Sequence, residues 1–214
     1  LFYLIILGML TSLSLPPLNY LLINFLTFSL FFIFLVRKLK QHKSFTLFFL
    51  YGWSFGFGYF VTNLYWISIS LTFDQDFKYL IPFAIILIPT FLGIFYGLVS
   101  FFFIILKPKK IGSAFLVFSM MFGIMEFARG SIFTGFPWNL IAYSFSEHLQ
   151  ILSVTSIIGT YGFNLFCISL FASPAVFFLK DNNKDIAIPL IFLIAPIVFY
   201  IYGSAYEKRF NNLN

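Results

Sequence analysis

The chain has 214 residues, of which 61% are hydrophobic and only 9% are charged, and its mean hydropathy is +0.98. Because a soluble domain carries about a quarter charged residues, this composition excludes a soluble globular protein and makes lipid the solvent for much of the surface. The net charge of +6 does not indicate nucleic-acid binding, since the basic residues gather in short loops between apolar segments.

Seven apolar segments follow one another along the chain, at residues 1–15, 20–36, 44–69, 80–106, 111–127, 149–179 and 186–203. They lack the alternating pattern of barrel strands, and a helix needs about 20 residues to cross the hydrocarbon core. We therefore predict an all-α membrane protein, a bundle of about seven transmembrane helices. The first segment is short, which is expected of a clipped N-terminus. The third, fourth and sixth are long, and we expect each to tilt, kink or extend past the interface.

The basic residues predict the orientation of the bundle. The positive-inside rule places most of the 13 Lys and Arg residues in cytoplasmic loops, namely Arg37, Lys38, Lys40, Lys43, Lys107, Lys109, Lys110, Lys180 and Lys184. The connections at residues 14–19, 72–79 and 134–148 and the C-terminal tail then lie outside. Seven spans accordingly give a multi-pass protein with a cytoplasmic N-terminus and an exterior C-terminus.

Small residues inside the segments predict helix packing. The pairs Gly52-x-x-x-Gly56 and Gly93-x-x-x-Gly97 are typical of faces on which membrane helices approach closely. The single cysteine, Cys167, lies in an apolar run, so we predict a buried and unreactive thiol. One cysteine forms no disulfide framework, and the sequence shows no metal-ligand spacing, so we expect neither a metal nor a cofactor.

The most specific segment, residues 126–144, reads EFARGSIFTGFPWNLIAYS. Glu126 and Arg129 lie three residues apart at the end of the fifth segment, and a helix would place them on one face within reach of each other. An ionised side chain at mid-bilayer costs about 2.5–3.5 kcal/mol, and we expect this pair near the outer interface, where the penalty is smaller.

A rigid turn follows that pair, with the sequence Gly135-Phe136-Pro137-Trp138. Proline fixes its own φ and glycine permits conformations barred to other residues, so the turn would hold its Trp at a set depth. Two interpretations of Arg129 stay open. It forms a structural ion pair that anchors the turn, or it also binds a phospholipid phosphate with its planar donors.

This segment resembles the Glu-x-x-Arg, Thr-Gly-Phe-Pro-Trp and Gly/Ala-Tyr-Ser signature of bacterial apolipoprotein N-acyltransferases, with Tyr143 in its last element. Residues 52–68 are similar to that family's Gly-rich third span, which ends in an aromatic–Trp pair, here Tyr65 and Trp66. Residues 158–166 are similar to its Gly-x-Tyr-Gly-x-x-Phe stretch. The resemblance implies that Tyr65 and Trp66 lie where lipid substrates enter. The alternative is that they only mark the membrane interface, where Trp and Tyr collect in any protein.

The resemblance also implies an activity and its partners. The family moves an acyl chain from a membrane phospholipid to a catalytic Cys, and then to the N-terminal diacylglyceryl-cysteine of a lipoprotein, in the bacterial inner membrane. Its chemistry lies in a nitrilase-like domain with a Glu–Lys–Cys triad, inserted after the seventh span. We therefore expect residues 1–205 to form the transmembrane domain and residues 206–214 to begin the connection to that missing domain. No catalytic residue is expected within the 214, and Cys167 does not match the nucleophile.

Two other functions stay open. A polytopic transporter or channel would line a path with polar groups near mid-membrane, and the segments offer few beyond Asn63 and Asn164. A non-catalytic scaffold left from a split or decayed gene would keep the motifs without the activity.

Overall fold

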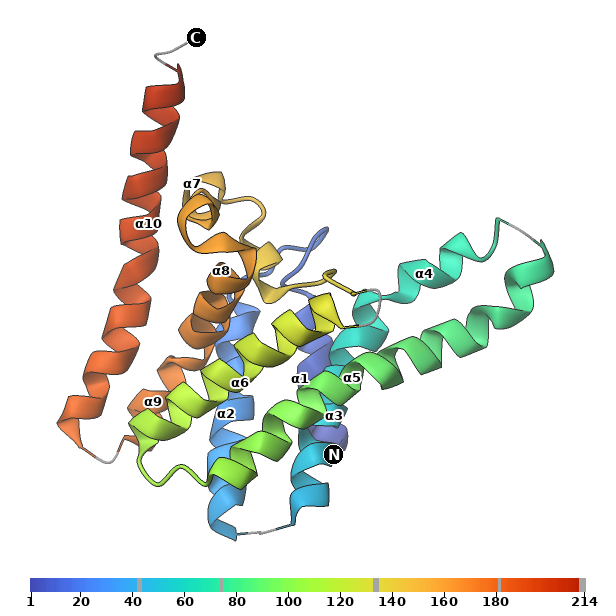
Figure 1. The fold of residues 1–214 in the computed structure, drawn as a ribbon, viewed down its shortest axis with the longest axis horizontal. Coiled ribbons are helices and arrows are strands. Elements are labelled where there is room, and N and C mark those ends of the chain that lie inside the picture. Colours follow the sequence, from blue (N-terminus) through green and yellow to red (C-terminus); the bar gives the residue numbers. More distant parts are fainter. Residues whose placement is uncertain (42–43, 74, 133–134, 181, 212–214) are drawn as a thin grey trace.

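The computed structural model describes residues 1–41, 44–73, 75–132, 135–180 and 182–211 of the chain (Figure 1). Three residues of the sequence interpretation, Lys43, Asp74 and Thr134, lie outside the described residues, as does the tail from 212. The described residues are helical with no strand, which confirms the all-α membrane fold.

The helices, in chain order, are α1 (Phe2–Ser12), α2 (Ile23–Gln41), α3 (Phe45–Asn63), α4 (Tyr65–Ser70), η1 (Gln75–Leu80), α5 (Ile81–Leu106), α6 (Ile111–Ser131), η2 (Ile141–Phe145), α7 (Leu149–Leu152), α8 (Thr155–Ala172), α9 (Pro174–Leu179), η3 (Asn183–Ile186) and α10 (Ala187–Asn211).

Five of the seven apolar segments form helical stretches that are long and apolar enough to span a membrane. Within the described residues these are Phe45–Asn63, Gln75–Leu106, Ile111–Ser131, Thr155–Leu179 and Asn183–Arg209. Of the other two, α1 has only 11 residues, and α2 has 19 residues but ends in a basic stretch. Basic residues at a helix end reach the headgroup region, so α2 keeps the pattern of a span with a charged terminus.

Breaks occur in two of the three long segments, as expected. The third segment divides at Leu64, where α3 ends and the short helix α4 begins. The sixth divides into α7, α8 and α9, and within α8 the backbone of Gly159 turns to φ 70 and ψ 167. The fourth instead continues through α5 for 26 residues with Pro89 inside it. Proline is tolerated in membrane helices because neighbouring groups satisfy the carbonyl it leaves unpaired.

Helices α3 and α5 pack face to face through the predicted glycine pairs. A Cβ added at Gly56 would lie 2.7 Å from the Cβ of Tyr96, and one added at Gly97 would lie 2.7 Å from the ring of Phe49. The indole of Trp53 donates a hydrogen bond of 3.0 Å to the carbonyl of Thr90 across the same contact. The prediction of close-packed glycine faces is confirmed, and this contact fixes α3 beside the site described below.

Phenylalanine rings fill the centre of the bundle. Phe31 of α2 stacks on Phe55 of α3 at 4.4 Å, and Phe31 also meets the α6 rings of Phe118 and Phe122 edge to face. Aromatic pairs in such geometries contribute about 0.5–1.5 kcal/mol beyond the area that they bury. The core therefore couples α2, α3 and α6 into one rigid body.

Helix α10 stands beside that body, as Figure 1 shows. Only 11% of its spanning stretch is buried within the described chain, so most of its apolar surface faces outward. It continues without a break through residues 205 and 206 as far as Asn211. The expected domain boundary thus falls inside a helix, and the division into two domains stays a prediction.

Candidate functional site

Helix α6 carries Glu126 and Arg129 near its C-terminal end. Nη2 of Arg129 donates to Oε2 of Glu126, which confirms the prediction that the two side chains meet on one helix face. The pair was expected near the outer interface. It lies at the end of α6, and protein covers it, so that Glu126 is 1% exposed and Arg129 2%. Burying an ion costs several kcal/mol unless a partner and further hydrogen bonds compensate for it.

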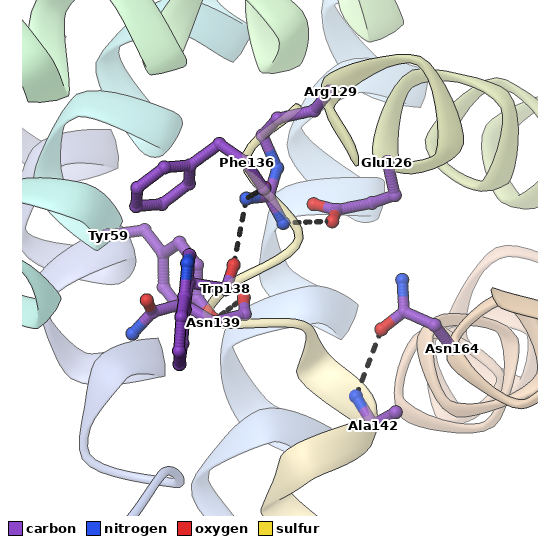
Figure 2. Close-up of polar contacts among 8 residues, drawn as sticks. All are labelled: Tyr59, Glu126, Arg129, Phe136, Trp138, Asn139, Ala142 and Asn164. Atoms are coloured by element: carbon purple, nitrogen blue, oxygen red, sulfur yellow. Dashed lines mark hydrogen bonds and ion pairs between the residues drawn. The ribbon is translucent and has the colours of Figure 1, made fainter. Parts of the chain in front are cut away.

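Arg129 also holds the turn that follows the helix. Its Nη1 donates to the carbonyl oxygens of Phe136, at 2.7 Å, and of Trp138, at 2.8 Å (Figure 2). Its own carbonyl accepts the N–H of Phe136 at 2.9 Å. Charge-assisted hydrogen bonds of this kind are stronger than neutral ones. One guanidinium group therefore joins the end of α6 to two points of the turn.

The backbone of the turn needs two unusual conformations. Gly135 has φ 73, and a Cβ there would lie 2.5 Å from the carbonyl oxygen of Gly130, so the sequence expectation for this glycine agrees with the geometry. Asn139 has φ 57, a region that Asn tolerates better than most residues. The hydroxyl of Tyr59 in α3 donates to the Asn139 carbonyl at 2.7 Å, which fixes the far end of the turn (Figure 2).

Aromatic rings and unsatisfied polar atoms surround the ion pair. The guanidinium carbon of Arg129 lies 5.2 Å from the ring centre of Phe60 and 6.0 Å from that of Phe136, distances at which cation–π attraction acts. Within the described residues, Oε1 of Glu126, Nε of Arg129 and the hydroxyl of Tyr96 make no hydrogen bond. Buried pairs with such unsatisfied atoms add little to stability compared with apolar packing. The arrangement is better explained by the shape it gives to the turn.

This geometry favours the first interpretation of Arg129. Both of its terminal nitrogens already bond to Glu126 or to carbonyls of the turn, and the side chain is almost fully covered. A lipid phosphate would reach the guanidinium only if the turn moved away. The structure thus supports anchoring of the turn, and a phosphate contact stays a prediction.

Three exposed aromatic residues gather where the turn meets α4. Tyr65 is 59% exposed, Trp66 45% and Trp138 59%. The rings of Trp66 and Trp138 meet edge to face at 6.5 Å, although they lie far apart in the sequence. Pro137 is also exposed, while Gly135 is half-buried. The fold thus brings together residues that the sequence motifs placed in separate segments.

A cavity of about 340 Å³ lies beside these aromatic residues. Tyr65, Trp66 and Asn139 line one part of it, and Asn63 from the end of α3 adds an amide. Residues of the connection between α1 and α2 line it as well. A concave, largely apolar space with a few polar groups is the usual form of a small-molecule site. Its lining includes the motif residues Tyr65 and Trp66.

Tyr143 lies on η2, which follows the turn in the sequence, and is 37% exposed. Partial burial raises the pKa of its phenol, the neighbouring Tyr161 adds to that rise, and Arg129 opposes it. Just before it, the N–H of Ala142 donates to Oδ1 of Asn164 in α8 at 2.9 Å (Figure 2). This bond joins the loop after α6 to the sixth segment.

Several residues of this network were absent from the sequence prediction of the site. Tyr59 and Asn164 hold the turn and the loop after it, and Asn139 takes a positive φ within the turn, yet only Asn164 was noted, as a polar residue within a span. The signal for Tyr59 was the same, because a hydroxyl in an apolar helix usually finds a partner. Cys167 is fully buried in α8, as predicted.

Comparisons with known proteins agree with the motifs. The family described as apolipoprotein N-acyltransferase N-terminal domain matches residues 7–173. Proteins named apolipoprotein N-acyltransferase from Rhodopseudomonas palustris and Rickettsia bellii are 32% and 33% identical to 92% and 94% of this chain. A protein of that name from Rhizobium etli is 30% identical over 94% of it. The chain spans 37–39% of the length of these three relatives.

Proposed function

This chain belongs to the apolipoprotein N-acyltransferase family, and we propose that it forms the membrane part of such an enzyme. In this proposal it holds the phospholipid acyl donor and the lipoprotein acceptor beside the outer leaflet of the bacterial inner membrane. Residues 1–205 serve as the transmembrane domain, and residues 206–214 lead to a nitrilase-like catalytic domain. The N-terminus is cytoplasmic and the C-terminus periplasmic, as the positive-inside rule predicts.

The observation that carries the proposal is the anchored turn beside the 340 Å³ cavity. Arg129 binds the main chain of the turn and so keeps Trp138 against Trp66, which lines that cavity. We assign lipid contact to Tyr65, Trp66, Trp138 and Tyr143. We assign support of the turn to Glu126 and Arg129. Apolar rings next to a cavity suit an acyl chain, whose binding is non-directional and grows with buried area.

A transporter function has little to support it. The relatives that match nearly all of this chain are named as acyltransferases, and the buried polar residues Tyr59 and Asn164 each bond to the protein main chain. A non-catalytic scaffold would share the same fold and motifs. Activity therefore has to separate the scaffold from the enzyme.

The test places residues 1–205 in a complete relative, in exchange for the matching N-terminal part, and measures conversion of diacylated to triacylated lipoprotein by mass spectrometry. An active chimera supports the enzyme assignment. Trp138→Ala and Arg129→Ala should each lower the rate at least tenfold. Lys78→Ala, which removes an exposed charge from η1, should leave the rate within a factor of two. A chimera that folds in the membrane but shows no transfer would support the scaffold instead.

A further inference from the structure

A second cavity, of about 420 Å³, lies at the other end of α6 from the Arg129 turn. It opens where α2 ends and where the short link between α5 and α6 passes. Four basic side chains line it, those of Lys40, Lys107, Lys109 and Lys110. Among the described residues that line it, none is acidic. The cavity therefore carries a concentrated positive charge without an opposing carboxylate in its wall.

The inner part of the cavity is apolar. Val36 of α2 and Ile111 and Ala114 of α6 line it and are only 3–4% exposed, whereas the lysines are exposed. Its volume lies within the range of roughly 300–1,000 Å³ that is usual for small-molecule sites. A small inorganic anion would use only the charged rim. A molecule with both a phosphate and a hydrocarbon part would use the rim and the floor together.

Local structure fixes where the lysines stand. Lys107 ends α5 in the left-handed region, with φ 42, so the chain reverses at once toward α6. Lys110 is the residue that precedes the first turn of α6, a helix of 21 residues whose N-terminus adds a partial positive charge to the same rim. The ammonium of Lys107 also lies over the ring of Phe45 at 6.0 Å. Lys109 and Lys110 are therefore the better pair with which to measure the charge of the rim.

We propose that this cavity binds the headgroup of an anionic phospholipid, with its phosphate among the four lysines and its glycerol and upper acyl carbons on the apolar floor. Basic pockets between membrane helices bind such headgroups by this combination of charge and burial. The site lies at the opposite end of the bundle from the proposed acyl-donor cavity. It does not depend on the proposed function, because it requires only that the chain lies in a membrane.

The test uses the full 214-residue chain, purified and delipidated in a neutral detergent, and native mass spectrometry to count bound lipid. Phosphatidylglycerol should bind at one site at least tenfold more tightly than phosphatidylcholine. In Lys109→Gln/Lys110→Gln the affinity for phosphatidylglycerol should fall about 30-fold, which corresponds to about 1 kcal/mol for each lysine. The control Arg37→Gln/Lys38→Gln removes the same charge from the end of α2, but neither residue lines this cavity. It should change the affinity less than threefold.

Three outcomes would overturn the proposal. An equal loss of phosphatidylglycerol affinity in both double variants would mean that the lipid binds through the general surface charge and not in this cavity. Competition by glycerol phosphate at the same concentration as the lipid would mean that the rim binds a soluble anion. Ala114→Leu fills the floor without a change of charge and should weaken phosphatidylglycerol at least tenfold, so an unchanged affinity would exclude the floor. Lys109 and Lys110 are exposed, so Lys109→Gln/Lys110→Gln should fold. Its phosphatidylglycerol affinity therefore tests the proposal even if Ala114→Leu does not fold.

Discussion

Removal of Arg129 while Glu126 remains should damage the protein more than removal of both charges. Arg129→Gln leaves a carboxylate buried without its partner and frees two carbonyl oxygens of the turn. Breaking a buried pair in this way costs about 3–5 kcal/mol. In Glu126→Gln/Arg129→Gln no charge is stranded, and unpaired neutral groups cost about 1–3 kcal/mol. The double variant should therefore be more stable than Arg129→Gln by about 2 kcal/mol.

The assay is reversible unfolding of the full chain in mixed micelles of a neutral detergent and dodecyl sulfate, followed by far-ultraviolet circular dichroism. Lys78→Gln is the matched control, because it removes one positive charge from an exposed position, and its stability should stay within about 0.5 kcal/mol of the parent. If Glu126→Gln/Arg129→Gln were less stable than both Glu126→Gln and Arg129→Gln, the pairing would be refuted. An Arg129→Gln chain as stable as the control would refute it as well.

Three further predictions follow from the fold. Single cysteines at Gln41 and Gln75, in a Cys167→Ser background, should label from opposite sides with an impermeant thiol reagent, and labelling of Gln41→Cys from outside in intact spheroplasts would reverse the orientation. The purified chain should form no hydroxylamine-sensitive acyl adduct with labelled phospholipid, because its one thiol is fully buried; an adduct lost in Cys167→Ser would contradict this. Gly52→Ala should lower stability by at least about 1–3 kcal/mol through overpacking, since its Cβ would lie 2.0 Å from the main-chain carbonyl oxygen of Tyr96 in α5. Gly162→Ala, where the nearest atom is 3.4 Å away, should cost less than 1 kcal/mol, and equal losses at both positions would argue against close packing of α3 on α5.

Much of the fold could be predicted because lipid imposes one simple requirement on a long apolar segment. Within such a segment the backbone must satisfy its own hydrogen bonds, so composition and length already specify a helix. The glycine pairs indicated faces of close packing for an equally local reason, since a side chain there would keep a neighbouring helix away, but they did not indicate that α3 and α5 would meet. The breaks at Leu64 and Gly159 were expected only as unlocated kinks, because their positions depend on contacts between segments.

Helical spacing and sequence adjacency predicted only the part of the site that lies within one continuous segment. A separation of three residues placed Glu126 beside Arg129, and the turn residues stood next to them in the sequence. The hydroxyl of Tyr59 and the amide of Asn164 come from other helices, and no spacing rule connects them to the turn. Their part in the network depends on how α3 and α8 pack, which the sequence pattern does not specify.

Arg129 binds main-chain carbonyl oxygens, which every amino acid has. The backbone conformation of the turn therefore does not depend on which side chain stands at the bonded position. At Trp138 the guanidinium bonds to the main-chain carbonyl and not to the indole, which is exposed. Replacement of the indole by another ring should therefore alter the surface beside Trp66 while the main chain keeps its course. If Trp138 contacts lipid as we propose, related proteins could change the preferred acyl chain at this position without rebuilding the loop.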